Sequence, residues 1–147
     1  MCTCTDDISI LISVLALIIS SLTFLYEVWH ARKVDTLSAF NTLQEQVLDD
    51  LAKYSNDDIK RIAAEHNSEE YILVASYLAR LEQFAKGVQL KIYDKKVVRA
   101  VLTTHLFGVY DKLKPIIDVK RKRGRNEKLY RGFEELVIEM KREIREA

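Results

Sequence analysis

Residues that interrupt helices are scarce in this sequence, which has four glycines and one proline among its 147 residues. A β-sandwich or barrel needs a turn about every 8–12 residues, and glycine and proline form many of those turns. This shortage excludes a turn-rich β fold and predicts long helices. The length allows one small domain with one appendage, and no stretch alternates with a period of two. We therefore expect an all-α protein.

An imbalance of charge is also absent, because 23 basic residues face 22 acidic residues and the net charge is +1. This balance excludes a polyanion and a general nucleic-acid-coating protein, so any argument from charge must be local.

Residue patterns typical of chemistry are missing as well. Cys2 and Cys4 are the only cysteines, and His30, His66 and His105 stand in separate segments without the spacing of metal ligands. The cysteines either cross-link neighbouring chains in an oxidising compartment or have no role. Without a nucleophile motif, phosphate loop or metal cluster, we expect no catalytic residue, no metal, no cofactor and no enzymatic activity.

One long uncharged run is present, over residues 8–26. Its nineteen residues span roughly 28 Å as a helix, which matches the hydrocarbon core of a bilayer. Twelve of them are Ile, Leu, Val or Phe, enough to outweigh four serines and one threonine. The run lacks the basic leader and small-residue cleavage site of a signal peptide, so we predict a transmembrane helix that is retained.

The charges beside this run predict its orientation. Asp6 and Asp7 precede it without any Lys or Arg, whereas Arg32 and Lys33 follow it. By the positive-inside rule, residues 1–7 form a short extracytoplasmic tail and the rest of the chain is cytoplasmic. The predicted anchors at the membrane interface are Tyr26, Trp29, Arg32 and Lys33.

Small residues form a stripe along one face of the predicted transmembrane helix, at spacings of three and four: Ser9, Ser13, Ala16, Ser20 and Thr23. Such faces let membrane helices approach closely, and hydroxyl groups can bond across the contact. The stripe therefore predicts a homo-oligomer. The alternative is that these hydroxyls bond back to their own helix.

The remaining sequence divides into a helical stalk over residues 27–54 and a cytosolic helical domain over residues 55–147. The stalk ends at a cluster of Ser, Asn and Asp. Within the domain, helices are predicted to start near Asn67 and Asp94, with a break or kink at Pro115. Glu82 and Glu134 lie at the margins of apolar faces, where Arg99 or a residue of the basic loop within residues 111–131 can hold either one.

That loop is the strongest electrostatic feature, because residues 111–131 contain nine basic and three acidic residues. Its candidate residues for binding an anionic partner are Lys120, Arg121, Lys122, Arg123 and Arg125. Three interpretations stay open: a solvated loop, a contact with anionic lipid, or a site for a nucleic acid or nucleotide. A short stalk keeps the loop near the membrane, which favours lipid.

Two segments carry a resemblance to known proteins, LARLEQFAKGVQLKIYDKKVV from Leu78 to Val98 and LKPIIDVKRKRGRNEKLYRGFEEL from Leu113 to Leu136. The chain resembles a family of uncharacterised bacterial proteins with a domain of unknown function, one N-terminal membrane helix and a small cytosolic helical domain. The shared features are a glutamate, a Gly-Val pair, an Asp that starts a helix, a Pro before an Arg-rich stretch, and a Tyr followed by Phe-Glu. The resemblance implies topology and fold, and it implies a location at the inner membrane of a bacterium.

These observations predict a single-pass, membrane-anchored helical module that self-associates or binds an unknown protein partner. The alternative is a small membrane effector, of the phage-defence or toxin type. In that case the oligomerised transmembrane helix perturbs the bilayer when the cytosolic domain senses a signal.

Overall fold

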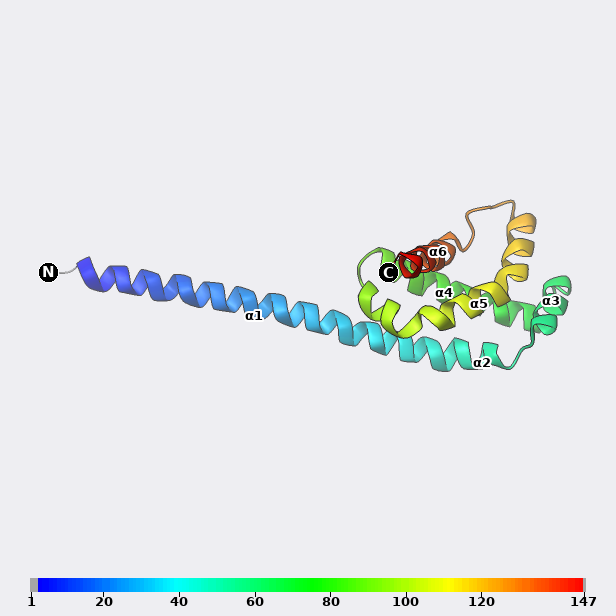
Figure 1. Ribbon diagram of the computed structural model, residues 1–147, viewed down its shortest axis with the longest axis horizontal. Coiled ribbons are helices and arrows are strands. Elements are labelled where there is room, and N and C mark those ends of the chain that lie inside the picture. The colour runs from blue at the N-terminus through cyan, green and yellow to red at the C-terminus, as the bar shows by residue number, and fades with distance from the viewer. Residues whose placement is uncertain (1–2, 147) are drawn as a thin grey trace.

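The computed structural model describes residues 3–146, and these residues form helices without any strand. The all-α prediction is confirmed. In chain order the elements are α1 (Thr3–Leu43), the π-helical turn η1 (Gln44–Leu48), α2 (Asp49–Ala52), α3 (Asn56–Ala64), α4 (Glu69–Gln89), α5 (Lys95–Gly124) and α6 (Arg131–Arg145). Figure 1 shows a small helical domain gathered around one end of a very long helix.

The long helix is continuous from α1 through η1 to α2, because the residues around η1 all have helical backbone angles. Its first part is exposed, but Thr36, Phe40, Leu43, Val47 and Leu51 are buried in the domain. The structure thus differs from the predicted division, in which residues 27–54 form a stalk outside the domain. The second half of that segment is a core helix, since its apolar residues recur every three or four positions.

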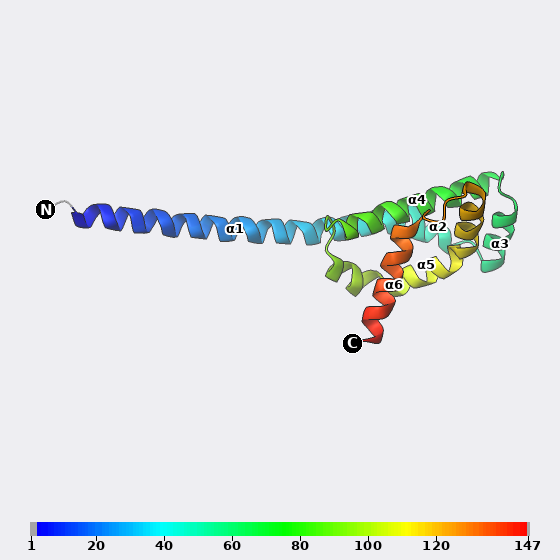
Figure 2. The same cartoon turned by 90° about the horizontal axis from the view of Figure 1, so that it is seen from above.

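The core of the domain joins α1, η1 and α2 to all the later helices. Leu78 and Leu81 of α4, Leu106 and Ile117 of α5 and Phe133 of α6 are almost completely buried. Figure 2 shows α6 crossing over α4 and α5 on the side away from α3. One contiguous hydrophobic cluster therefore includes the inner end of the long helix.

The helices begin close to the predicted positions, with local differences. Ser55 caps α3 and exchanges bonds with Asp58, and Ser68, one residue after the expected Asn67, caps α4. Asp94 caps α5 as predicted, through its Oδ1 atom and the amides of Lys96 and Val97. Serine and aspartate oxygens satisfy amides that lack a partner in the first helical turn.

Helix α5 passes through Pro115 without ending, and its direction changes between the yellow and gold parts in Figure 1. Proline removes one helical hydrogen bond and crowds the preceding turn, which is a common cause of a kink. After the kink the helix continues to Gly124. Residues 120–124, predicted as part of a loop, are therefore the last turns of α5.

Candidate functional site at the junction of the apolar helix and the domain

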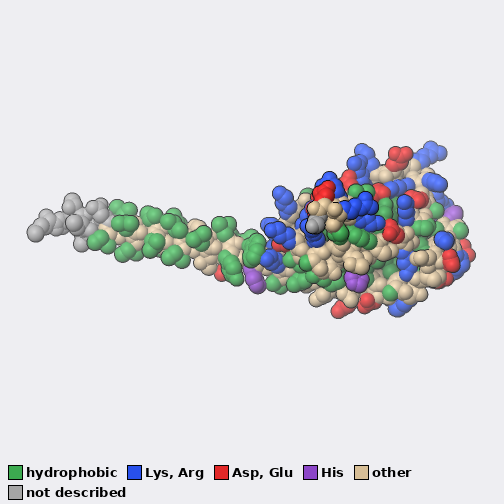
Figure 3. Space-filling model, viewed as in Figure 1, with side chains coloured by type: hydrophobic (Ala, Val, Ile, Leu, Met, Phe, Trp, Pro, Cys, Tyr) green, Lys and Arg blue, Asp and Glu red, His purple; other side chains and the backbone are tan. Residues whose placement is uncertain are grey.

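Among the described residues, one helix is long and apolar enough to span a membrane, and its most apolar stretch is entirely unburied. Large apolar side chains along it are open on every side, with Leu11 at 69% and Leu17 at 68% exposure. Figure 3 shows this bare apolar rod leaving the charged surface of the domain. A soluble environment strongly disfavours such a surface.

Three hydroxyl groups of the apolar segment bond within their own helix. Ser13 Oγ donates to the carbonyl of Ser9 at 2.9 Å, and Thr23 Oγ1 donates to the carbonyl of Ile19 at 2.9 Å. Ser21, which lies off the stripe, bonds in the same way to Leu17. These bonds satisfy the hydroxyl hydrogens and leave the small side chains of the stripe exposed on the helix surface.

Aromatic and basic side chains gather where the apolar segment ends. Lys33 Nζ lies 3.3 Å from the centroid of the Trp29 ring, a cation–π contact. Tyr26 lies beside both Trp29 and His30, with ring centroids about 6 Å apart. All the predicted interface anchors are thus found within two turns of one helix.

Thr36 helps to set the position of the domain along the long helix. It is the one buried polar side chain among the described residues. Its hydroxyl donates to the carbonyl of Arg32 at 2.6 Å and accepts from the amide of Asp94 at 2.7 Å. Because both partners are backbone groups, the turn between α4 and α5 is held directly against α1.

This turn, residues 90–94, ends α4 in a Schellman motif. The amide of Ile92 donates to the carbonyl of Gly87, and the amide of Lys91 donates to the carbonyl of Val88. Lys91 adopts the left-handed conformation, with a φ of 59°, at a position that glycine usually occupies. Leu90 and Ile92 on either side of it are 71% and 59% exposed.

A depression of about 740 Å³ lies between this turn and α1. Its wall combines Trp29, Arg32 and Lys33 of α1 with Lys91 of the turn and the start of α5. Five basic residues line it, and its two acidic residues are Asp94 and Glu139. Figure 3 shows Lys and Arg side chains at the end of the domain from which the apolar helix emerges. We call the five residues the basic collar: Arg32, Lys33, Lys91, Lys95 and Lys96.

The collar cations differ in their surroundings. Lys95 Nζ contacts Glu139 at 2.7 Å and Glu143 at 2.5 Å. Desolvation acts to lower the pKa of Lys95, but the hydrogen bonds that it donates to these two carboxylates raise that pKa above its ordinary value. Lys33 lies over the Trp29 ring. Lys91 and Lys96 are exposed, and no ion pair joins either of them to a described residue. These two cations are available to an external anion.

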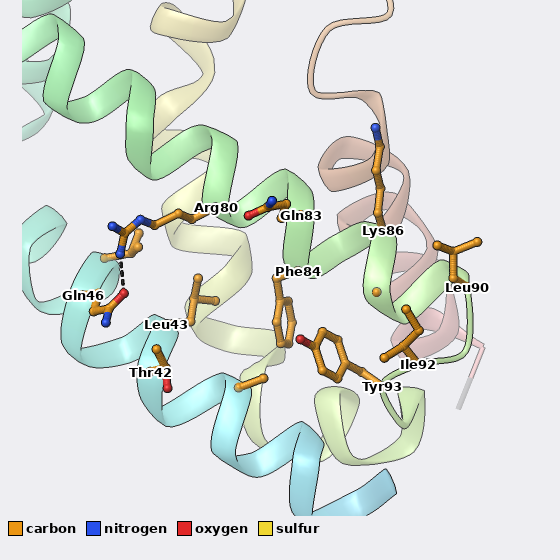
Figure 4. Close-up of a pocket in the computed structure, with 13 residues that line it drawn as sticks. Thr42, Leu43, Gln46, Arg80, Gln83, Phe84, Lys86, Leu90, Ile92 and Tyr93 are labelled. Carbon is orange, nitrogen blue, oxygen red and sulfur yellow. Dashed lines mark hydrogen bonds between the residues drawn. The ribbon is translucent and has the colours of Figure 1, made fainter.

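A second hollow, of about 580 Å³, lies on the other side of the turn, between α1, η1 and α4 (Figure 4). Phe84 and Tyr93 stack at its base with centroids 5.2 Å apart, and Arg80 bonds to Gln46 across its mouth. Gly87 is required here, because a Cβ atom would lie 2.4 Å from the Tyr93 ring. Its described lining holds no carboxylate, histidine or cysteine, so it offers no acid–base pair.

The predicted anion-binding residues of the 120–125 segment lie at the opposite end of the domain. Lys120 is close to the ring of Tyr71, at the start of α4, whereas the basic collar lies at the end of α4. The 21 residues of α4 span roughly 30 Å. Lys122 and Arg125 line an open hollow there with Lys128. This segment therefore lies about the length of α4 from the basic collar, and its binding of an anionic partner stays a prediction.

Arg121, also named as an anion-binding candidate, is engaged inside the domain. Its guanidinium contacts Glu134 at 2.7 Å and donates to the carbonyl of Leu129 at 2.9 Å. Tyr110 donates to the same Glu134 carboxylate at 2.6 Å. These bonds from Arg121 and Tyr110 lower the pKa of Glu134, and Arg121 holds the loop before α6 in place.

Glu82 and Arg99 have partners that the sequence did not indicate. The Glu82 carboxylate accepts from the amides of Gly132 and Phe133, at 3.2 and 2.7 Å, so α4 supplies the cap for α6. Arg99 contacts Glu143 at 3.5 Å and does not pair with Glu82 or Glu134. Among the predicted ion-pair residues, only Glu134 lies against a residue of the basic segment.

Thr36 and Lys91 were missed in the sequence. Thr36 carries no pattern that distinguishes it from other helical threonines, so its role depends on tertiary contact. The collar lysines did give a signal, since Lys91, Lys95 and Lys96 lie close together around a predicted helix boundary. The 120–125 segment contains more basic residues, so charge counted along the sequence favours that segment over the collar. Cys2 lies outside the described residues, and so does the side chain of Cys4.

The sequence matches the family described as "Domain of unknown function (DUF4760)" over residues 8–140. The chain therefore belongs to this family. Searches of curated proteins and of solved structures gave no match. The matched region begins at the first residue of the apolar run, so the family's domain includes the apolar helix together with the helical bundle.

Residues that carry the resemblance occupy joints between helices. Glu82 caps α6, Gly87 makes room for Tyr93, and Asp94 caps α5. Glu134 ties α6 to the kinked end of α5 through Arg121. These roles are structural, and they explain a shared fold without indicating a shared reaction.

Proposed function

We propose that this member of the DUF4760 family is a single-pass membrane protein that holds a helical interaction module rigidly at the cytoplasmic surface. The observation that carries the proposal is one uninterrupted helix that is bare and apolar at one end and part of the domain core at the other. No flexible linker lies between these parts, so the membrane fixes both the distance and the orientation of the domain.

The proposed orientation places the segment before Ile8 outside and the domain inside. Arg32 and Lys33 support it, because basic residues that follow a membrane helix stay on the cytoplasmic side. A reporter that works only in the cytoplasm should be active when it is fused after Ala147. Activity of a reporter that requires the exterior would overturn this orientation.

Membrane anchoring is tested separately by extraction. The full chain should stay with the membrane in high salt and in alkaline carbonate, and detergent should release it, because the apolar helix crosses the hydrocarbon core. Release by salt or carbonate alone would show a peripheral protein and refute the proposal.

Self-association through the small stripe is the second part of the proposal. Ser20→Leu places a bulky side chain on the stripe. The control, Ser21→Leu, places the same side chain on another face of the helix. We expect Ser20→Leu to weaken cross-linking between chains in the membrane and Ser21→Leu to leave it unchanged. Equal cross-linking in both variants would leave the stripe without a role.

The same pair of variants tests the effector alternative. If stripe-mediated association perturbs the bilayer, overexpression arrests growth with ion leakage, and Ser20→Leu relieves the arrest while Ser21→Leu does not. Normal growth on overexpression supports the interaction module instead.

A further inference from the structure

We propose that the turn between α4 and α5 is a second membrane contact, which binds anionic phospholipid headgroups of the leaflet that α1 crosses. This inference rests on the proposed membrane anchoring. The contacting residues are the exposed apolar pair Leu90 and Ile92, with Lys91 and Lys96 and, from α1, Arg32.

The first argument concerns depth. Trp29 lies one helical turn beyond Tyr26, the last residue of the uncharged run, which places it in the interfacial layer of the bilayer. Lys91 and Lys96 share one depression with Trp29 and Arg32. The turn therefore lies at the level of the headgroups, within a Debye length of about 8 Å from their charge.

The second argument concerns the chemistry of the turn. Leu90 and Ile92 expose 71% and 59% of their surface at the end of the domain that faces the membrane. Apolar side chains flanked by lysines suit the boundary between acyl chains and headgroups, where the apolar part enters and the ammonium groups meet phosphate. A soluble acidic ligand would use the cations but would leave both apolar side chains in water.

The third argument concerns the backbone. Lys91 has a φ of 59°, a conformation that costs a non-glycine residue free energy. Glycine would relieve this cost, yet the chain has a lysine whose side chain is exposed and joined by no ion pair to a described residue. The ammonium group of Lys91 is therefore free to meet an external anion at this turn.

The experiment uses the full chain in lipid nanodiscs, with Cys2 and Cys4 replaced by Ser and an environment-sensitive fluorophore attached through Ile92→Cys. Discs contain either phosphatidylcholine alone or phosphatidylcholine with 30% phosphatidylglycerol. Quenching of Trp29, the single tryptophan, by brominated lipid reports the anchor. Quenching and blue shift of the fluorophore report the turn.

We expect Trp29 to be quenched in both discs, and the fluorophore at position 92 to be quenched mainly in the anionic discs and released by salt. Lys91→Gln with Lys96→Gln should reduce the docking equilibrium about 25-fold, at roughly fivefold for each cation. The matched control, Lys122→Gln with Arg125→Gln, removes two exposed charges at the far end and should leave docking unchanged.

Two results would overturn the inference in different ways. A quenched Trp29 with the same fluorophore signal in neutral and anionic discs, or equal effects of the two double variants, refutes the second contact and leaves the anchor standing. An unquenched Trp29 refutes the proposed function itself and the contact with it. Both pairs of residues are exposed, so the variants should keep the helical content and melting temperature of the parent chain.

Discussion

The two halves of the long helix have the same backbone structure and opposite surroundings. Up to Val34 its large apolar side chains are exposed. After Thr36, the side chains of Phe40, Leu43 and Val47 are buried and expose less than a tenth of their surface. The first half is apolar on all sides, and the second is apolar along one stripe. The difference shows that one helix combines a segment long and apolar enough to span a membrane with a segment of the protein core.

The π-helical turn η1 belongs to the second half. Val47 and Leu51 follow Leu43 at intervals of four residues, which would drift away from one face in a regular α-helix. The extra residue of a π turn corrects such a drift. Both side chains remain on the buried face, at 0% and 1% exposure.

The largest effects are expected from arginine substitutions, one in the domain core and two in the apolar segment. Ile117→Arg places an unpaired charge in the core and should cost more than about 4 kcal/mol, unfolding the domain while the chain stays in the membrane. Leu15→Arg with Ile18→Arg should prevent insertion, at about 3 kcal/mol for each arginine, while the domain stays folded.

Membrane fractionation measures insertion of the apolar helix, and circular dichroism in detergent measures folding of the domain. If Ile117→Arg also released the chain from the membrane, or if the double variant unfolded the domain, the two halves would depend on each other.

A smaller effect is expected at Glu134, which concerns only the domain. Glu134→Gln removes the charge that binds Arg121 and Tyr110 and should cost about 2 kcal/mol at neutral pH. The pKa of Glu134 is below its ordinary value of 4.5 in the folded state, so its contribution is present above 4.5 and is lost as the pH falls through the lower folded value.

Melting temperatures in detergent across this range provide the check. Parent and Glu134→Gln should differ most near neutral pH and converge in acid. A difference that does not change with pH would mean that the carboxylate charge contributes nothing.

Thr36 tests the joint between the two halves. Thr36→Val keeps the shape but leaves the amide of Asp94 without its partner, which should cost about 1–2 kcal/mol. Thr36→Ser keeps the hydroxyl and should cost less. Hydrogen exchange at Asp94 should quicken in the valine variant only, and protection in that variant would show that the joint does not depend on this bond.

The smallest effect, and the only stabilising one, is expected at the turn. Lys91→Gly relieves the left-handed conformation and should raise stability by up to about 1 kcal/mol, seen as a higher melting temperature. Lys91→Asn, which tolerates this conformation and also removes the charge, is the control. A lower melting temperature for the glycine variant would show that Lys91 makes a stabilising contact in the domain.

The sequence alone determined the class of the fold and most helix boundaries. Scarce glycine and proline and the capping residue Asp94 act locally, so their consequences can be read without a partner. The uncharged run over residues 8–26 is likewise a property of composition and length. The position of Pro115 predicted a break or a kink, because a proline acts on its own helix, and the structure has the kink.

Only the tertiary structure decided which distant residues cap or pair with the ends of the helices. The cap of α6 comes from Glu82, about fifty residues earlier, and the partner of Arg121 comes from α6. The same folding placed the 120–125 segment far from the apolar helix and brought Lys91 and Lys96 beside Trp29. Charged residues can be counted along a chain. The groups that surround each of them depend on packing between distant helices, which composition and periodicity do not specify.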